Sequence, residues 1–216
     1  MKLFFHYCPV SFSNCYVLGT EFSPEEALPG TPPHKPAHRK AVLIDPGYMD
    51  EAIVNFIENS EYHLLAVLIT HDHANHVRGL QTLKRIYDAD IYAVNPLVLD
   101  YKTILVRDRD ICRIGPFRFE VISVPGHSPD SAVFKIDNLL FTGDALSAGL
   151  VGRTVSTYGA ATQMTALQSK ILSLPGDFTI LPGHGPPSSL EAEQRFNAGV
   201  QLYEQSKNQR RVFTVE

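Results

Sequence analysis

The sequence predicts a mixed α/β protein in which two β-sheets pack together with helices on their outer sides. Strand-like and helix-like segments follow one another in mixture, twice over, along the 216 residues. Hydrophobic residues make up 44% of the chain and charged residues 19%, which is the balance of a globular protein with a core. Such a mixture buries its apolar faces when two sheets face each other and helices cover them.

In the first half of the chain, apolar runs bounded by turn residues predict strands at residues 3–5, 15–18, 41–44, 64–69 and 91–94. The run Leu64–Ile69 is apolar throughout, which indicates burial on both faces. Apolar residues at helical spacing predict helices over Asp50–Asn59 and Val77–Tyr87.

The second half repeats this mixture, with strands predicted at residues 104–106, 117–124, 132–136, 139–141 and 178–181. Helices are predicted over Thr162–Ser173 and Ser188–Ser206. The second of these carries a capping signal from Ser188 or Ser189 together with Glu191. We therefore expect one domain over residues 1–216. Within it, residues 21–40 carry five prolines and predict an exposed loop inserted between strands.

Composition excludes several classes of function. The net charge of −4 and the pI of about 6.1 offer no basic face for nucleic acid. The apolar runs are too short to span a bilayer, and the N-terminus lacks the pattern of a signal peptide. The three cysteines, Cys8, Cys15 and Cys112, match no zinc or redox motif, which favours buried thiols in a reducing cytoplasm. The expected partner is a small-molecule substrate, and the oligomeric state stays open.

Histidines and one aspartate follow the predicted strands in turns rich in glycine and proline. Imidazole and carboxylate groups are good ligands for zinc, iron(II) and manganese. His71 and His73 are two positions apart, so in extended backbone their rings point to the same side. A lone histidine in a loop is usually a surface or capping residue, but this combination predicts a metal site. The residues that carry this prediction are His71, His73, His76, His127, Asp144 and His184. The other histidines, His6, His34, His38 and His63, lack such settings.

These residues resemble the metallo-β-lactamase superfamily, whose pattern is His-x-His-x-Asp-His, a separate His, a Gly-Asp and a last His. The resemblance extends over nearly the whole chain. Within that superfamily, the chain is similar to the single-domain relatives of hydroxyacylglutathione hydrolase (glyoxalase II). The stretches that carry it are residues 13–16, 42–47, 141–144, 152–154, 174–177 and 181–186.

The resemblance implies a four-layer αββα sandwich with its site along one edge. It implies one metal held by His71, His73, His127 and Asp144. A second metal would be held by position 75, His76, His184 and the shared Asp144. The implied cofactor is one or two Zn²⁺ ions, with Fe²⁺ or Mn²⁺ as alternatives. The implied chemistry is hydrolysis by a metal-activated water, for which Asp144 and position 75 would be the catalytic carboxylates.

Position 75 departs from the family pattern, because Asn75 stands where the family has aspartate. An amide offers only a neutral oxygen and cannot accept a proton from water. Three alternatives follow: Asn75 is a weak ligand in a filled second site, the second site is empty, or the chain is a weakened hydrolase. Asp72 is expected to point away from the metals, toward nearby backbone or a supporting contact. Arg153 and Tyr158 are candidates for contact with a substrate carboxylate, against a structural role for Arg153 in bridging loops.

The first functional hypothesis is hydrolysis of a thioester, such as an acylated glutathione or another small thiol. A second is iron-dependent oxygenation of a persulfide, which a one-metal site would suit. Hydrolysis of a lactone or phosphodiester is a third. A fourth hypothesis is that the protein is not an enzyme but a family member that binds metal or ligand without catalysis. The replacement of the usual aspartate by Asn75 motivates this hypothesis.

Overall fold

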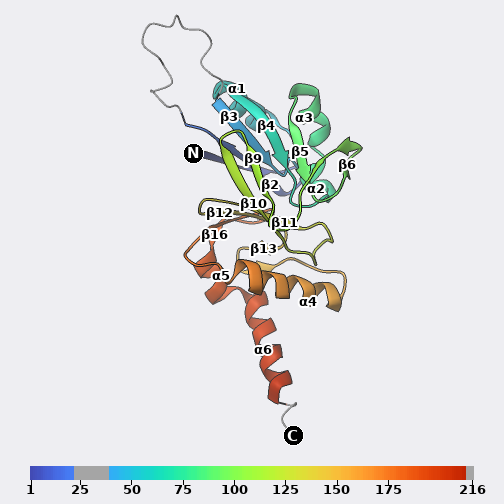
Figure 1. Ribbon diagram of the computed structural model, residues 1–216, viewed down its shortest axis with the longest axis vertical. Coiled ribbons are helices and arrows are strands. Elements are labelled where there is room, and N and C mark those ends of the chain that lie inside the picture. Colours follow the sequence, from blue (N-terminus) through green and yellow to red (C-terminus); the bar gives the residue numbers. More distant parts are fainter. Residues whose placement is uncertain (22–38, 213–216) are drawn as a thin grey trace, which may run out of the picture. The chain divides into compact units, whose positions relative to one another are not determined.

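The computed structural model describes residues 1–21 and 39–212, with side chains up to residue 205. Two compact units make up the chain: unit 1 comprises residues 1–106 and 112–118, and unit 2 comprises residues 107–111 and 119–216. One six-stranded sheet lies in unit 1, and unit 2 carries most of another (Figure 1). The predicted loop at residues 21–40 lies outside the described residues except at its ends, as do His34 and His38.

The sheet of unit 1 is mixed. An antiparallel hairpin forms its first edge, and its third strand pairs antiparallel with that hairpin. The remaining strands pair in parallel. Every residue of the second strand is buried, which its run of apolar and small residues explains. In spatial order the strands are β1 (Lys2–Cys8), β2 (Ser13–Gly19), β3 (Arg39–Ile44), β4 (Tyr62–Leu68), β5 (Asp90–Ala93) and β8 (Ile104–Leu105).

Three helices cover one face of this sheet. Helix α1 (Glu51–Asn59) begins where the Asp50 carboxylate accepts hydrogen bonds from the backbone N–H groups of residues 52 and 53. Its buried Ile53 and Ile57 join a core that also takes residues from α2 (Ala74–Val77) and α3 (Leu80–Ile86). A small hairpin of β6 (Leu97–Val98) and β7 (Tyr101–Lys102) follows β5 along the chain.

The second sheet is also mixed. Its two central strands, residues 139–143 and 179–182, pair in parallel, and each of them pairs antiparallel with its other neighbour in the sheet. In spatial order it contains β16 (Ser188–Ser189), β15 (Thr179–Pro182), β12 (Leu139–Gly143), β11 (Ala132–Ile136), β10 (Phe117–Ser123) and β9 (Ile111–Ile114). A short hairpin, β13 (Leu146–Ser147) with β14 (Leu150–Val151), follows β12. The prediction of two mixed sheets is confirmed.

Helical segments from the later part of the chain pack on the apolar core of unit 2. They are α4 (Thr157–Ala166), the π-helical segment η2 (Leu167–Ile171), α5 (Leu190–Phe196) and α6 (Ala198–Val212). Met164, Leu167, Ile171 and Leu190 pack with strand residues in one apolar core. The predicted cap of the last helical region is confirmed, since Ser189 Oγ accepts from the backbone N–H of residue 192.

Three predicted helices have other bounds in the structure. The helix predicted over Val77–Tyr87 is two helices, because Gly79 donates its N–H to the Pro46 carbonyl at 2.8 Å. The helix predicted over Ser188–Ser206 breaks at the buried Asn197, whose ψ of 116° is not helical. The helix predicted from Thr162 begins at Thr157, where Ser156 caps it. The missed first turn consists of small and exposed residues without an apolar stripe.

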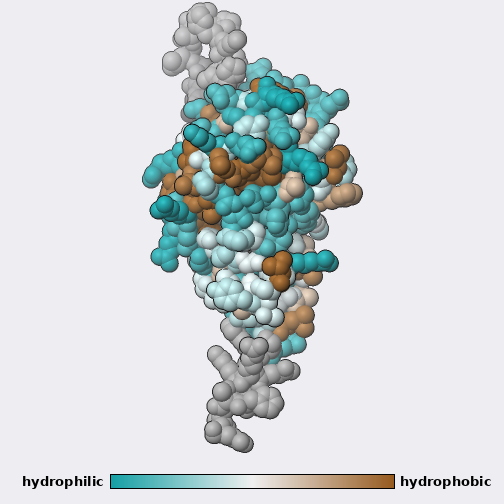
Figure 2. Space-filling model, turned by 90° about the vertical axis from the view of Figure 1, so that its right-hand side faces the viewer, coloured by the Kyte–Doolittle hydropathy of each residue, from teal (hydrophilic) through white to brown (hydrophobic). Residues whose placement is uncertain are grey.

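Cys8, Cys15 and Cys112 are buried thiols, as expected. Among the described helices, none has the length and apolar character needed to cross a membrane. Figure 2 shows apolar patches within a largely hydrophilic surface. Exposed apolar residues of unit 1 include Leu97, Ile104 and Leu105. The expectation of one domain over residues 1–216 stays a prediction.

Candidate metal centre

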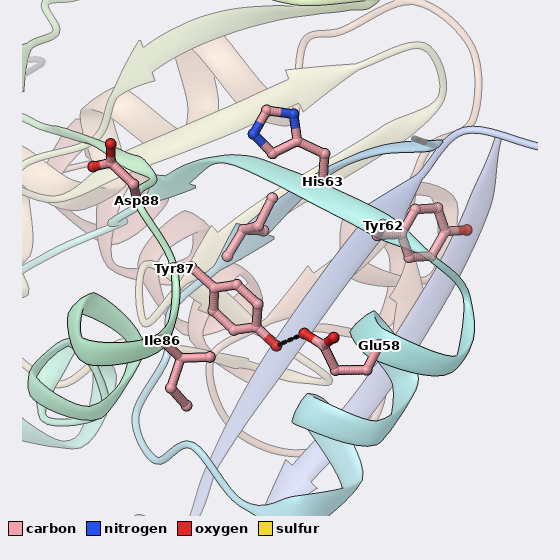
Figure 3. Close-up of a pocket in the computed structure, with 7 residues that line it drawn as sticks. Glu58, Tyr62, His63, Ile86, Tyr87 and Asp88 are labelled. Atoms are coloured by element: carbon pink, nitrogen blue, oxygen red, sulfur yellow. Dashed lines mark hydrogen bonds between the residues drawn. The ribbon is translucent and has the colours of Figure 1, made fainter. Parts of the chain in front are cut away.

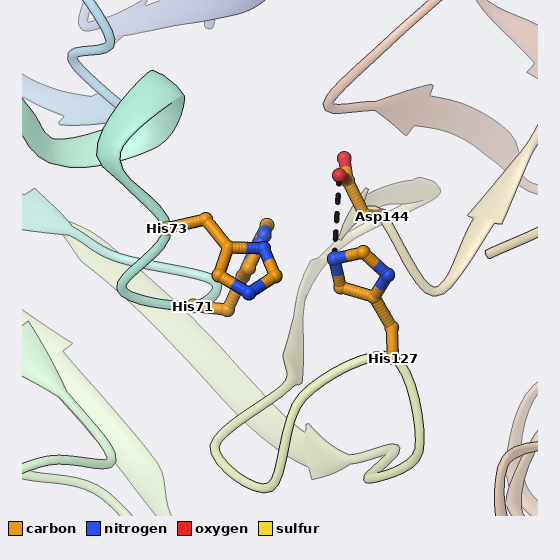
Figure 4. A group of neighbouring side chains, drawn as sticks. All are labelled: His71, His73, His127 and Asp144. Carbon is orange, nitrogen blue, oxygen red and sulfur yellow. Dashed lines mark ion pairs between the residues drawn. The ribbon is translucent and has the colours of Figure 1, made fainter. Parts of the chain in front are cut away.

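Unit 1 brings three predicted ligands together at the end of a parallel strand. His71 and His73 lie in the loop after β4, and His76 lies in α2. The ring centroid of His71 lies 4.6 Å from that of His73 and 4.2 Å from that of His76. His71 and His76 are buried and His73 is exposed. Figure 4 shows the His71 and His73 rings as close neighbours, as their spacing in extended backbone predicts.

A buried carboxylate holds two of these rings. Asp45 Oδ2 accepts the Thr70 hydroxyl at 2.6 Å and lies 3.1 Å from His76 Nδ1. Because the Thr70 hydroxyl proton goes to Asp45, its oxygen can only accept from His71 Nδ1, which lies 3.1 Å away. Both imidazoles therefore carry their proton on Nδ1, and in the neutral ring Nε2 keeps its lone pair for a metal.

The backbone of Asn75 is held closely within unit 1. Ser13 Oγ donates to the Asn75 carbonyl at 2.6 Å. A Cβ at Gly47 would lie 1.9 Å from that same carbonyl oxygen, so only glycine allows this approach. The half-buried Asn75 side chain thus stands on a fixed backbone between His73 and His76 in sequence.

Unit 2 brings the other three predicted ligands together. His127 lies between β10 and β11, Asp144 directly follows β12, and His184 follows β15. Because β12 and β15 run in parallel with Gly143 opposite Pro182, Asp144 and His184 emerge at the same sheet edge. Asp144 Oδ2 lies 3.5 Å from Nε2 of His127 and 3.5 Å from Nε2 of His184. Figure 4 shows His127 turned toward Asp144.

The backbone carbonyl of Arg153 accepts a hydrogen bond from His127 Nδ1 at 2.8 Å. A carbonyl oxygen can only accept, so the proton lies on Nδ1 and Nε2 faces the Asp144 carboxylate. The Arg153 side chain itself is exposed, and Tyr158 is 80% exposed at the start of α4. Contact of these two side chains with a substrate stays a prediction.

The donor chemistry in each unit fits a divalent metal. Three imidazoles have Nδ1 engaged by an oxygen acceptor and Nε2 directed elsewhere, which is the usual arrangement of metal-binding histidine. The ligand atoms of His71 and His73 lie within 4.8 Å of each other, as do those of Asp144 and His184. A nitrogen-rich set with one carboxylate suits zinc and also iron(II).

Residues expected to stay out of the metal site have other roles in the structure. Asp72 accepts a hydrogen bond from the Asn95 side chain at 2.7 Å and is exposed. His6 Nε2 lies 2.6 Å from the Asp50 carboxylate at the start of α1.

His63 lines a pocket of about 440 Å³ in unit 1 that contains none of the predicted ligands. The Tyr87 hydroxyl donates to Glu58 Oε1 at 2.8 Å in this pocket, and Figure 3 draws this bond as a dashed line. Burial, followed by the Glu58 carboxylate, raises the pKa of Tyr87. Since none of the predicted ligands lines this pocket, it adds nothing to the proposed metal chemistry.

Sequence reasoning missed the residues that orient the ligands. Asp45 stood only within a stretch of family resemblance, and Thr70 was not among the candidate residues. The position of Asp45 in the turn after an apolar strand could have identified it, because His71 also lies in the loop after such a strand. The Arg153 carbonyl carried no signal, because a backbone acceptor is present at every residue.

Residues 37–186 match the family model described as the metallo-beta-lactamase superfamily. A hydroxyacylglutathione hydrolase of Chromohalobacter salexigens is 33% identical over 151 residues, which cover 68% of this chain and 58% of that enzyme. The chain thus spans less than two thirds of that relative's length. The human mitochondrial persulfide dioxygenase ETHE1 is 31% identical over 203 residues, which cover 90% of this chain and 74% of that enzyme.

Two solved structures are similar as well. The structure of ETHE1 from Myxococcus xanthus has a TM-score of 0.75 and 27% identity, and the match covers 92% of this chain and 84% of that one. A protein solved in a di-iron-bound form, TTHA1623, has a TM-score of 0.67 and 28% identity. That match covers 86% of this chain and 94% of the other.

Proposed function

Because the chain belongs to the metallo-beta-lactamase superfamily, we propose that it is a metal-dependent hydrolase of a thioester, such as an acylated glutathione or another small thiol. Following the family pattern, the proposed ligands of the first metal are His71, His73, His127 and Asp144. The second metal would use His76, Asn75, His184 and the shared Asp144.

The observation that carries the proposal is the orientation of the imidazoles. Thr70, Asp45 and the Arg153 carbonyl each engage the Nδ1 of one ring, at 3.1, 3.1 and 2.8 Å. Supporting partners of this kind fix the tautomer and raise the basicity of a ligating nitrogen.

A bound zinc or iron ion would polarise the thioester carbonyl and lower the pKa of a bound water. The chain's own groups divide the remaining work. Asp144 faces two imidazoles with one carboxylate oxygen, so its negative charge offsets that of a cation shared between them. Asn75 offers a neutral amide, which cannot take a proton from water, so a second site would be less negative than in relatives with aspartate.

The test is a purification without added chelator, followed by elemental analysis and assays with a panel of acyl-thiol substrates. We expect one or two metal ions per chain and turnover that chelator removes and metal restores. His71→Gln should lose metal and turnover together. His63→Gln is the matched control, since His63 is an exposed histidine of the same unit outside the ligand set. Metal-loaded protein without turnover above background for every acyl thiol would refute the proposal.

Oxygenation of a persulfide by a single iron is the second candidate. The similarity to persulfide dioxygenase covers 90% of this chain, and Asn75 weakens one of the two implied sites. One iron per chain with oxygen uptake on a persulfide substrate would favour this reaction. Two zinc ions per chain with acyl-thiol turnover would favour the hydrolase.

A further inference from the structure

Gln163 is a buried polar residue in the middle of α4, with 1% of its surface exposed. Its side-chain amide donates to the Ala145 carbonyl at 3.1 Å and to the Gly152 carbonyl at 3.1 Å. A buried amide in a helix interior is unusual, because apolar residues fill such positions at no cost in lost hydrogen bonds to water. Its two bonds therefore call for an explanation.

Both acceptors lie directly beside residues of the proposed metal centre. Ala145 follows Asp144, and Gly152 precedes Arg153, whose carbonyl orients His127. Gly152 also donates its N–H to the Ala145 carbonyl at 3.2 Å. The Gln163 amide thus ties together the two ends of the β13–β14 hairpin, one of which carries Asp144 while the other holds the His127 ring.

The stem of Gln163 packs against the loop of His127 itself. A Cβ at Gly126 would lie 2.4 Å from the Gln163 Cβ, and Gly126 has a φ of 146°. The residue before His127 therefore rests on the Gln163 side chain. The loop that carries His127 and the two ends of the β13–β14 hairpin, beside Asp144 and Arg153, therefore meet at this one residue of α4.

The orientation of the amide is determined by its partners. Flipping it would place Oε1 against two carbonyl oxygens, which would repel it. Within the described part of the chain, no donor lies within hydrogen-bond distance of Oε1. The side chain thus serves as a donor to the two loop carbonyls.

We propose that Gln163 is a positioning residue, which sets the places of the Asp144 carboxylate and the His127 ring through the segments that carry them. The inference rests on the proposed metal centre for its effect on metal affinity. Its effect on the His127 tautomer is independent of any metal.

The variant Gln163→Met tests the proposal, because methionine has a similar shape and keeps the packing but cannot donate. Gln194→Met is the matched control, since the exposed Gln194 also donates to a backbone carbonyl, that of Leu172 at 2.7 Å, away from the ligands. We expect Gln163→Met to bind Zn²⁺ about 10–100-fold more weakly in a chelator competition, the range found for groups that support ligands. Gln194→Met should bind as the wild type does.

A second readout uses metal-free protein far below its thermal midpoint. In ¹⁵N NMR, the wild-type His127 should be protonated on Nδ1, and Gln163→Met should shift it toward the Nε2–H tautomer. A role in folding alone would lower the midpoint without this shift. Unchanged tautomer and unchanged zinc affinity in folded Gln163→Met would overturn the inference. A wild type that binds no zinc would refute the metal centre, while the tautomer would still decide the role of Gln163.

Gly152→Ala approaches the same contact from the hairpin. Its Cβ would lie 1.9 Å from the Asp144 carbonyl oxygen and 3.0 Å from the Gln163 amide nitrogen. This variant should also weaken zinc binding and shift the His127 tautomer. If Gln163→Met fails to fold, a folded Gly152→Ala with wild-type affinity and tautomer overturns the inference.

Discussion

In unit 1 the carboxylate oxygen Oδ2 of Asp45 lies 3.1 Å from Nδ1 of His76, and both side chains are buried. The same carboxylate also accepts the hydroxyl and the backbone N–H of Thr70. Asp45 has a φ of 50°, so the turn after β3 carries it into this position in the left-handed region. One carboxylate therefore orients His76 directly and His71 through Thr70.

Replacing Asp45 with asparagine should weaken metal binding. The amide can offer either an oxygen or an N–H to the three groups that the carboxylate now accepts, and it lacks the charge that favours the Nδ1–H tautomers. We expect the affinity for Zn²⁺ to fall about 10–100-fold in a chelator competition. Asp88→Asn is the control, because the exposed Asp88 forms a surface ion pair with Lys84 and is not one of the proposed ligands. Wild-type affinity in Asp45→Asn would show that this carboxylate does not support the ligands.

Restoring aspartate at position 75 should strengthen the second metal site. The backbone is already fixed by Ser13 Oγ and by the close approach of Gly47, so the new carboxylate would stand where the amide stands. The added negative charge should raise the affinity for a second Zn²⁺ by about tenfold or more, as changes at supporting groups do. Elemental analysis and the rate with acyl thiols would both be measured. If neither changes in Asn75→Asp, position 75 was never a limiting ligand.

Most of the candidate ligands could be predicted because they follow apolar runs at strand ends, and His76 because it lies close after His71 and His73 in sequence. Strand ends in parallel pairs meet at one edge, as Ile44 and Leu68 do in the β3–β4 pair. The supporting groups could not be predicted in this way. Asp45 reaches Thr70 and His76 across 25 and 31 residues, and that proximity exists only once β3 and β4 pair. Gln163 looks like any polar residue of a surface helix until the loops that it holds are in place.

Helix boundaries likewise separate what the sequence pattern predicts from what depends on side-chain contacts. The apolar stripe after Ser189 continues through Asn197, so periodicity alone favours one long helix. The structure ends α5 there because the Asn197 side chain caps the next helix: Oδ1 accepts from the Val200 N–H three residues later, while Nδ2 donates to Glu193 in the preceding turn. Local pattern gives the presence of a helix, and side-chain contacts decide where it breaks.

Glu193 should matter far more for stability than its helix neighbour Glu191. The buried Glu193 carboxylate accepts hydrogen bonds from Ser188 Oγ and Asn197 Nδ2, both at 2.6 Å, and from the Gly149 N–H. Glu193→Gln should lower the free energy of unfolding by about 2–3 kcal/mol. The amide has only one acceptor oxygen, so some of these three donors would face its NH₂ group and lose their hydrogen bonds. Glu191 makes an exposed ion pair with Arg195 at 2.7 Å, and Glu191→Gln should cost less than about 1 kcal/mol. Urea denaturation of both variants checks this, and equal losses would contradict it.

The buried thiol of Cys8 should make the fold sensitive to alkaline pH. Burial, followed by the Asp50 carboxylate, raises the pKa of Cys8 from 9.0 to about 11. The unfolded chain releases this proton near pH 9 and the folded chain only near pH 11. The contribution of the neutral thiol is therefore fully present below pH 9 and is lost as the pH rises through 11. A shift of this size corresponds to about 3 kcal/mol.

The variant Cys8→Ala separates this effect from packing. Loss of the sulfur leaves a small cavity, which lowers the free energy of unfolding by a constant amount at every pH. What should change is the slope of the unfolding free energy against pH between pH 8.5 and 11. Over that interval the variant should lose about 3 kcal/mol less unfolding free energy than the wild type. Burial also raises the pKa of Cys15 and Tyr16, so the variant should retain some alkaline loss. Parallel curves of unfolding free energy against pH, measured by urea denaturation, would show that Cys8 keeps its ordinary pKa in the folded protein.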